Sequence, residues 1–350
     1  MQKIVTVLFL LLIFINISYV TTGVLFHPVQ SMDAIGIWFF KAKAFYIEQG
    51  FPNNFLHNAN YAYSHQRYPL GLPFIIFLFY RLMGGVNDHS FLILYPISYC
   101  LILLLVYKIF RRHTNTIYSL IFVYIYSMFS PLIAAGGRIL AGNADIFLVL
   151  VEWIFIYILY KKKFSIAKCI LIMILVMIAS QIKFEGIFLS GILLFLPVSR
   201  KLRISLFCVS LTPIILWTWV TIAFKIPTDT HPIVPSLFLA IERMAIIAFG
   251  IIRELGNINN WYIFWVLVLL SVLIKQKISP LLKQTLLPAY FLMMFLYVLV
   301  YLFASNNTNE YISSSFDRVL FQQSALVFLF FFEKMITPTR ELFDRLLKGK

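Results

Sequence analysis

The sequence DAIGIWFFKAKAFYIE (residues 33–48) follows the first long apolar run of the chain, at 4–26, and precedes HQRYPLGLP (residues 65–73). Both stretches belong to a polar interval at 27–90, which separates the first apolar run from the second. The interval is rich in ionisable groups, whereas the other such groups stand in short clusters between apolar runs. We therefore expect this interval to set the sidedness of the fold and to carry much of its chemistry.

The composition is that of a membrane protein. Of the 350 residues, 61% are hydrophobic and 12% are charged, whereas soluble domains are roughly half apolar and about a quarter charged. Apolar runs long enough to cross a bilayer recur along the chain, and no polar segment is long enough for a separate soluble domain. This predicts an all-α polytopic membrane protein, in which residues 1–350 form a single membrane-embedded domain.

We expect about ten transmembrane helices, with apolar cores at 4–26, 91–110, 117–134, 145–160, 166–180, 187–199, 204–224, 259–274, 285–304 and 318–333. The first run is longer than the core of a signal peptide and no convincing cleavage site follows it, which favours an uncleaved span. A further apolar piece at 72–84 is too short to cross unaided. Its length alone allows a span, an interfacial helix or a helix that enters the membrane partway.

The charges favour the interfacial reading of 72–84. If this piece does not cross, 19 of the 29 basic residues fall on one side, in short connections and the C-terminal tail: Lys3, Lys108, Arg111, Arg112, Lys161, Lys162, Lys163, Lys168, Arg200, Lys201, Arg203, Lys275, Lys277, Lys283, Lys334, Arg340, Arg345, Lys348 and Lys350. By the positive-inside rule this side is cytoplasmic and holds both termini. The external segments are then 27–90, 135–144, 181–186, 225–258 and 305–317.

The net charge of +15 therefore reflects membrane orientation. No folded basic domain exists to receive a duplex, so we expect no nucleic-acid partner. The partner that the composition predicts is the lipid bilayer. The three cysteines, Cys100, Cys169 and Cys208, lie inside apolar runs without metal-like spacing, which favours buried small side chains.

Asp33 opens the segment at 33–48, which we expect to form an apolar helix. At 100° per residue, Lys41 and Glu48 lie within about 80° of Asp33, whereas Lys43 lies on the other flank. Asp33 is interpreted either as a helix cap or as a functional carboxylate, and we favour the second role. Lys43 is better explained as a side chain that reaches the membrane surface.

Arg67 lies in the segment HQRYPLGLP, just before the expected juxtamembrane helix at 72–84. A guanidinium at headgroup depth suits a phosphate through its planar fork of donors, and contact with ordinary lipid headgroups is the equally weighted alternative. His57 and His65 have no spacing typical of a metal site and read as polar loop residues.

Two further external connections carry charges at the edges of spans. Arg138 precedes Asp145, which opens a span either as a helix cap or as a pocket carboxylate. Lys183 and Glu185 interrupt an apolar run, where charges are costly unless they are paired or functional. We interpret both as pocket-lining residues.

The remaining charged positions are harder to interpret. Glu152 lies well inside a span and is either a buried partner or a group that faces the bundle. Asp317 and Arg318 open the last span, where they can pair, cap the helix or, for Arg318, contact a lipid phosphate.

These features together resemble the C-type glycosyltransferases, the membrane family that includes protein O-mannosyltransferases and aminoarabinose transferases. The likeness covers roughly residues 1–220, with a weaker echo at 315–318. It rests on an acidic residue after the first span, a basic residue before a Tyr-Pro-Leu segment, an Asp that opens a span, and an external Lys-x-Glu-Gly: Asp33, Arg67 to Leu70, Asp145, and Lys183 to Gly186. The family's acidic pair is a single Asp33 here, and its Lys-Pro-Pro-Leu is Arg-Tyr-Pro-Leu.

The resemblance implies a GT-C fold and transfer of a sugar from a polyprenyl-phosphate donor to a lipid, glycan or protein acceptor. The enzyme would lie in a bacterial inner membrane with its active site outside. Asp33 would accept the proton of the acceptor hydroxyl. Fixed cations would stabilise the leaving phosphate, the candidates being Lys41, Arg67, Arg138, Lys183 and Arg318. Asp145, Glu185 and His65 would line the acceptor pocket. A divalent metal is possible but is not required by this residue set.

Two other functions compete with sugar transfer. A transporter or flippase of a lipid-linked sugar would place ionisable groups near the bilayer midplane and repeat a pattern in two halves. No repeat is visible, and Glu152 is the main charge within a span. A non-catalytic scaffold gives no reason for acids and bases to gather on one face.

Overall fold

The computed structural model describes residues 2–161, 165–227, 237–303 and 307–348, and within these ranges all regular structure is helical. The elements, with η for 3-10 and π helices, are α1 (Gln2–Phe26), η1 (Ala34–Phe39), α2 (Phe40–Ile47), α3 (Asn53–His57), η2 (Ala59–Ser64), α4 (Gly71–Met83), α5 (Asp88–Phe91), α6 (Leu94–Phe110), α7 (Thr116–Ser127), α8 (Ser130–Gly137), α9 (Asp145–Leu159), α10 (Ile166–Ile182), η3 (Phe184–Phe195), α11 (Arg200–Ser210), α12 (Thr212–Ala223), α13 (Leu237–Leu255), α14 (Ile258–Trp261), α15 (Phe264–Val272), η4 (Leu282–Leu286), α16 (Leu287–Phe303), α17 (Thr308–Gln322) and α18 (Ser324–Lys348). The prediction of an all-α chain is confirmed over this part of the protein.

Several helices are long and apolar enough to cross a membrane. By length and composition the described residues contain four such helices, or up to six if each of two bent pairs is one span. The bent pairs are α7 with α8, at 72°, and α17 with α18, at 54°. Other apolar helices are shorter, among them α4 and α10. These helices are compatible with an integral membrane protein.

Helix α1 turns an apolar face outward. Only 11% of its most apolar window is buried inside the protein, and large side chains such as Leu8, Leu11 and Phe14 are at least half exposed. In water this surface would be strongly unfavourable, because exposed apolar area costs about 25 cal/mol per Å². Hydrocarbon is the solvent that such a face suits.

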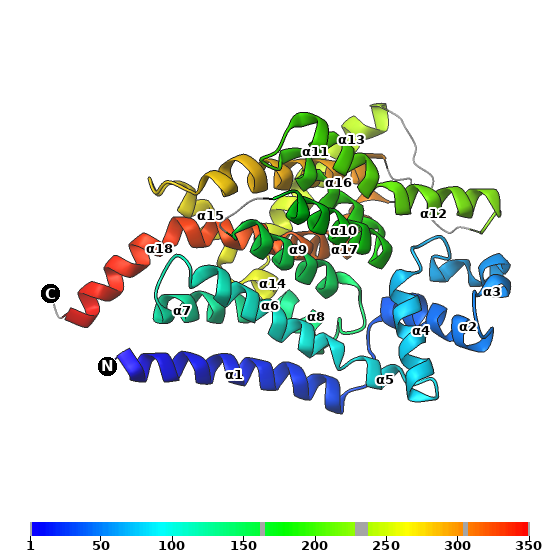
Figure 1. Cartoon of the computed structure of the whole chain (residues 1–350), viewed down its shortest axis with the longest axis horizontal. Coiled ribbons are helices and arrows are strands. Elements are labelled where there is room, and N and C mark those ends of the chain that lie inside the picture. The colour runs from blue at the N-terminus through cyan, green and yellow to red at the C-terminus, as the bar shows by residue number, and fades with distance from the viewer. Residues whose placement is uncertain (1, 162–164, 228–236, 304–306, 349–350) are drawn as a thin grey trace.

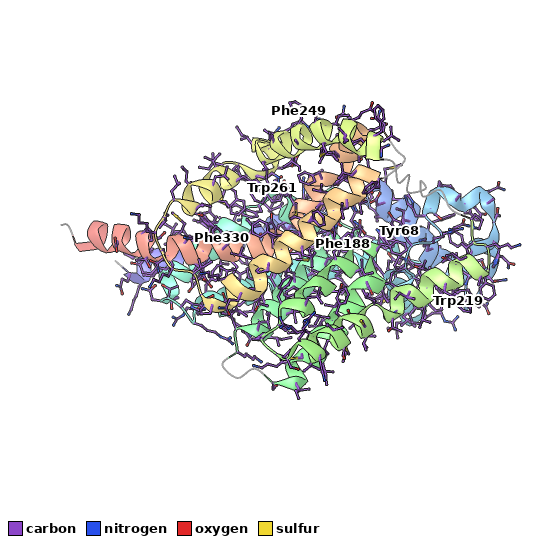
Figure 2. All side chains as sticks on the ribbon, turned by 90° about the horizontal axis from the view of Figure 1, so that it is seen from above. Tyr68, Phe188, Trp219, Phe249, Trp261 and Phe330 are labelled. Carbon is purple, nitrogen blue, oxygen red and sulfur yellow. The ribbon has the colours of Figure 1, made fainter. Side chains whose placement is uncertain are left out.

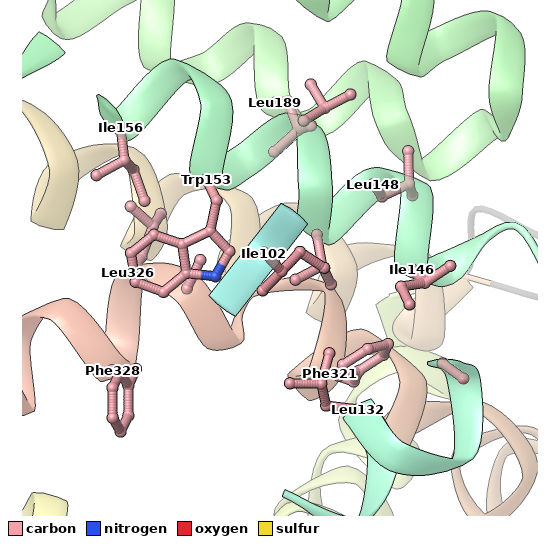
Figure 3. Packing of buried hydrophobic residues seen from close by; sticks show 14 of the residues in the cluster. Ile102, Leu132, Ile146, Leu148, Trp153, Ile156, Leu189, Phe321, Leu326 and Phe328 are labelled. Carbon is pink, nitrogen blue, oxygen red and sulfur yellow. The ribbon is translucent and has the colours of Figure 1, made fainter. Parts of the chain in front are cut away.

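The bundle core is aromatic and aliphatic. Trp153 of α9 packs edge-on against Phe110 of α6, and Phe110 stacks on Phe332 of α18 at 3.7 Å between ring centroids. Figure 3 shows Trp153 and Phe328 in this region. Polar side chains also link the helices, as when Asn16 of α1 donates to Ser127 of α7 at 2.9 Å. Such interhelical bonds are worth about 0.6 kcal/mol in a membrane bundle, and close packing contributes alongside them.

Helices α1 and α8 touch through their backbones. A Cβ at Gly137 would lie 2.0 Å from the carbonyl oxygen of Val20, and a Cβ at Gly23 would lie 2.0 Å from the carbonyl oxygen of Gly137. Small residues permit this approach, which is common between membrane helices. The contact holds the end of α1, and hence the chain that follows it, against the α8–α9 connection.

The two termini lie at one end of the molecule, and the segment α2–α5 lies at the opposite end (Figure 1). The polar interval at 27–90 folds into short helices at that end, including the 13-residue α4 that corresponds to the apolar piece at 72–84. The start of α4 is fixed by Gly71, where a Cβ would lie 2.5 Å from the carbonyl oxygen of Gln181. The polar interval is thereby held against the end of α10.

The helices differ from the predicted spans in several places. Residues 237–255, which belong to the expected external segment at 225–258, form the 19-residue helix α13. The expected span at 187–199 is largely η3, a 12-residue 3-10 helix. Its rise of about 2.0 Å per residue lets it reach further than an α-helix of equal length. Parts of the expected loops at 225–258 and 305–317 lie outside the described residues.

Candidate active site

Three helix ends and the body of α17 bring charged side chains together. Asp33 stands just before η1, and Asp145 is the first residue of α9. Lys183 follows the last residue of α10 in an extended conformation. Arg318 belongs to α17. All four were candidates from the sequence, and the structure joins them in one network.

Arg318 is the centre of this network. Its Nη1 donates to Oδ2 of Asp33 at 2.6 Å, and its Nε donates to Oδ2 of Asp145 at 2.8 Å. Two edges of one guanidinium therefore hold carboxylates that are 112 residues apart in sequence. The third nitrogen, Nη2, is buried and has no hydrogen-bond partner.

Asp145 receives three donors in all. Besides Arg318, its Oδ1 accepts from Nζ of Lys183 at 2.8 Å and from Nε2 of Gln322 at 2.5 Å. The hydroxyl of Tyr297 donates to Oε1 of Gln322 at 2.8 Å, which orients that amide. The side chain of Asp145 is only 2% exposed. A carboxylate that is so buried and so fully bonded positions its neighbours and is poorly suited to exchange protons.

Lys183 extends the network to Glu185, whose Oε1 lies 3.0 Å from its Nζ. Oε2 of Glu185 is buried without a partner. The turn that carries both residues requires Gly186, because a Cβ there would lie 2.2 Å from the carbonyl oxygen of Ala179.

Asp33 is the most exposed acid of the network, with 34% of its side-chain surface exposed against 26% for Glu185. It occupies the cap position of η1 but makes no capping hydrogen bond. Its bonded partner is Arg318, so the capping alternative does not account for this side chain. Likewise Ala144, and not Asp145, occupies the cap position of α9.

A hydrogen bond between uncharged side chains ties the two carboxylate segments together. The hydroxyl of Ser31 donates to Oδ1 of Asn143. Each residue stands two positions before a carboxylate of the network, Asp33 in one case and Asp145 in the other. This pair could not be predicted from the sequence, because neither residue carries a charge or belongs to a motif.

Lys41 and His65 lie next to the network through Tyr68. Lys41 is fully buried, and its Nζ donates to the carbonyl oxygen of His65 at 2.6 Å. The same Nζ lies 5.5 Å from the centroid of the Tyr68 ring, and the imidazole of His65 stacks on that ring at 4.7 Å. Lys41 and His65 therefore support Tyr68.

Arg67 and Arg138 have other partners. Nε of Arg67 donates to the carbonyl oxygen of Ile226 at 2.8 Å, and the guanidinium of Arg138 lies 4.7 Å from the ring centroid of Tyr19. Arg138 also borders a small cavity beside α1, at Gly23 and His27. Neither arginine has an ion pair to the network among the residues that the structure describes. Their expected role in phosphate binding has no support from these contacts.

The described part of the chain contains no group of three or more His, Cys, Asp and Glu side chains that could share a metal ion. The acids of the network are balanced instead by Lys183 and Arg318. The possible divalent metal thus finds no ready set of ligands in these residues.

Glu152 lies two turns along α9 from Asp145 and is fully buried. Its Oε2 accepts a hydrogen bond from the backbone N–H of Ala325 at 3.3 Å, and its Oε1 has no partner. Ala325 is the second residue of α18, just after the bend from α17. Helix α9 therefore carries two acids that bond to the bent helix pair: Asp145 bonds to α17 and Glu152 bonds to α18.

No protein-family model matches the sequence, no curated protein matches it, and no solved structure matches the fold.

Proposed function

We propose that this chain is an integral membrane glycosyltransferase of the C type, which moves a sugar from a polyprenyl-phosphate donor to an external acceptor. The observation that carries the proposal is the bridge that Arg318 forms between Asp33 and Asp145, at 2.6 and 2.8 Å. It sets a partly exposed carboxylate directly beside fixed positive charge. Sugar transfer from a phosphate needs a carboxylate and a cation that both lie close to the bond between the anomeric carbon and the phosphate oxygen.

The reaction assigns a role to each charge. The acceptor oxygen attacks the anomeric carbon and forms the new glycosidic bond, while its proton passes to the carboxylate of Asp33. The bond from the anomeric carbon to the phosphate oxygen breaks, and its electron pair leaves on the polyprenyl phosphate. The growing negative charge is stabilised by Arg318, whose Nη2 is unpaired, with Lys183 and Lys41 as further cations nearby.

The arrangement of the chain supports this proposal. Both termini lie at the end of the molecule opposite the segment that follows Asp33 (Figure 1). We propose about ten membrane crossings in a GT-C fold, cytoplasmic termini, and a site that opens to the outside of a bacterial inner membrane. The short and bent helices then act as crossings because neighbouring helices cover their ends.

Transfer can be tested with purified protein, a radiolabelled polyprenyl-phosphate sugar and the variant Asp33→Asn. Wild-type protein is expected to transfer or hydrolyse the sugar, and Asp33→Asn is expected to lose at least 100-fold in rate, about the contribution of a general base. Asp88→Asn is the matched control, because Asp88 lies in the same segment and pairs with Lys43 at 2.6 Å, outside the network. Equal rates for wild type and Asp33→Asn would remove Asp33 from the mechanism.

One observation favours a second candidate, a flippase or transporter of a lipid-linked sugar. Glu152 is a fully buried acid with an unpaired oxygen, next to a bent helix pair. Acids within membrane spans commonly belong to ion or substrate pathways. Protein in liposomes would then move a fluorescent polyprenyl-phosphate sugar between leaflets without cleaving it, and Glu152→Leu would stop that movement. Sugar release that is sensitive to Asp33→Asn would instead favour the transferase.

A further inference from the structure

Tyr68 has surroundings that differ completely from those of its neighbour Arg67. The carbonyl oxygen of Arg67 accepts a hydrogen bond from Trp217 of α12, and its guanidinium binds the chain at Ile226. Tyr68 instead lies where the α2–α4 segment meets the bundle, as Figure 2 shows. The residue of the Arg-Tyr-Pro-Leu segment that faces the ion-pair network is therefore the tyrosine.

The ring of Tyr68 is held on several sides. His65 stacks on it at 4.7 Å between centroids, and Phe184 meets it edge-on at 5.5 Å. Trp38 lies at 6.1 Å, and the ammonium of Lys41 lies 5.5 Å from the ring centroid. Phe184 is the residue directly before Glu185, so the ring is anchored to the turn that carries this acid. A ring fixed in this way directs its hydroxyl with little rotational freedom.

The charges of the network act on that hydroxyl. Burial raises the pKa of Tyr68 well above its usual value, and nearby Glu185, Tyr311 and Asp33 raise it further, whereas Arg318 lowers it. The phenol therefore stays protonated through the neutral range and remains a hydrogen-bond donor.

Two atoms of the network are buried and lack partners, and they differ in kind. Oε2 of Glu185 can only accept a hydrogen bond when ionised, and Nη2 of Arg318 can only donate one. Leaving such groups buried and unpaired is unfavourable, and a ligand relieves that cost if it supplies the missing partner. A phosphate oxygen suits the arginine, but it is repelled by the carboxylate. A sugar hydroxyl, which both donates and accepts, suits Glu185 and Tyr68 together.

We propose that Tyr68 and Glu185 form the sugar-binding half of the site, in which Tyr68 donates to one hydroxyl of a neutral glycosyl group and Glu185 accepts from an adjacent one. The inference rests on the proposed glycosyl transfer and divides the site into two parts. Arg318 holds the phosphate, and the tyrosine and glutamate hold the sugar. The donor would thus carry two neighbouring free hydroxyls on its sugar.

Binding measurements on the purified full-length protein separate the two halves. The probes are farnesyl phosphate and its mannosyl, glucosyl and arabinosyl esters. Wild-type protein is expected to bind at least one ester more tightly than farnesyl phosphate. Tyr68→Phe should lower the affinity for that ester about 5- to 10-fold, the value of one hydrogen bond, and leave farnesyl phosphate unaffected. Glu185→Gln, which keeps the size of the side chain, should act in the same direction.

Tyr63→Phe is the matched control, because Tyr63 lies in the same segment with its side chain exposed and its ring against Phe40. The inference is overturned if Tyr68→Phe weakens both kinds of ligand equally or weakens neither. It is also overturned if wild-type protein binds the esters no better than farnesyl phosphate. Failure of wild-type protein to bind any of the four probes would instead reject the proposed function, and this inference with it.

Discussion

Arg318 joins two acids with different edges of one planar group, and lysine cannot reproduce this geometry. Lys at 318 can reach Asp33 or Asp145 but cannot form both bonds at 2.6 and 2.8 Å. Removing a partner from a buried pair is destabilising. We expect Arg318→Lys to lower the free energy of unfolding by about 1–2 kcal/mol. This is less than the cost of removing the cation altogether, because lysine keeps the positive charge. Thermal unfolding in detergent measures it.

Arg67→Lys serves as the control for this substitution, because Nε of Arg67 donates to a single backbone carbonyl. Its effect on the midpoint of unfolding should be clearly smaller. Equal shifts for the two variants would argue that the bridge contributes nothing special to stability.

The Ser31–Asn143 hydrogen bond aligns the segments that carry Asp33 and Asp145. We expect Asn143→Ala to cost about 1 kcal/mol in stability and to lower kcat more than it raises KM, because the geometry of the acids loosens. Ser31→Ala should have nearly the same effect, and the double variant should cost little more than either single one. Additive losses would show that the two residues act independently.

At the scale of elements, the contact between α1 and α8 determines where the segment after α1 lies. A Cβ at Gly137 would lie 2.0 Å from a backbone oxygen of α1, so Gly137→Ala forces the two helices apart. Overpacking of this kind typically costs about 1–3 kcal/mol. We expect a lower unfolding midpoint and lower transfer activity.

Gly36→Ala is the matched control, since nothing lies within 4 Å of a Cβ at that position. Alanine favours helices over glycine by about 1 kcal/mol, so Gly36→Ala should be neutral or stabilising. A loss as large as that of Gly137→Ala would show that replacing a glycine in this region is destabilising by itself, and would argue against the close approach as the cause.

The sequence predicted the charged members of the network better than it predicted the helices. Asp33, Asp145, Lys183 and Arg318 stood out because charges at the edges of apolar runs are costly unless they are paired or functional. Gln322 and Tyr68 gave no such signal, since uncharged polar side chains are common there. Helix α13 was not among the expected spans, because its charges, Glu242 and Arg243 among them, interrupt the apolar run. They do not oppose a helix, since Glu and Arg are good helix formers.

At the scale of the whole molecule, the proposed sidedness predicts which positions can be labelled from outside. With the three native cysteines replaced by alanine, Asn60→Cys should react with a membrane-impermeant maleimide in spheroplasts, whose inner membrane is intact. Lys277→Cys should react only after permeabilisation. Both side chains are exposed, so burial does not confuse the result. Reversed labelling would show that the chain has the opposite orientation in the membrane. Labelling of both positions from outside would show that the proposed alternation of the spans is wrong.

The bond between Asp33 and Arg318 joins positions 285 residues apart. At about 5–20 residues per second, the ribosome needs roughly 15–60 seconds to travel from the first to the second. Throughout that time Arg318 has not yet been made, so Asp33 lacks this ion-pair partner. In the proposed mechanism Arg318 stabilises the leaving phosphate, so the proposed sugar transfer requires that synthesis has passed residue 318.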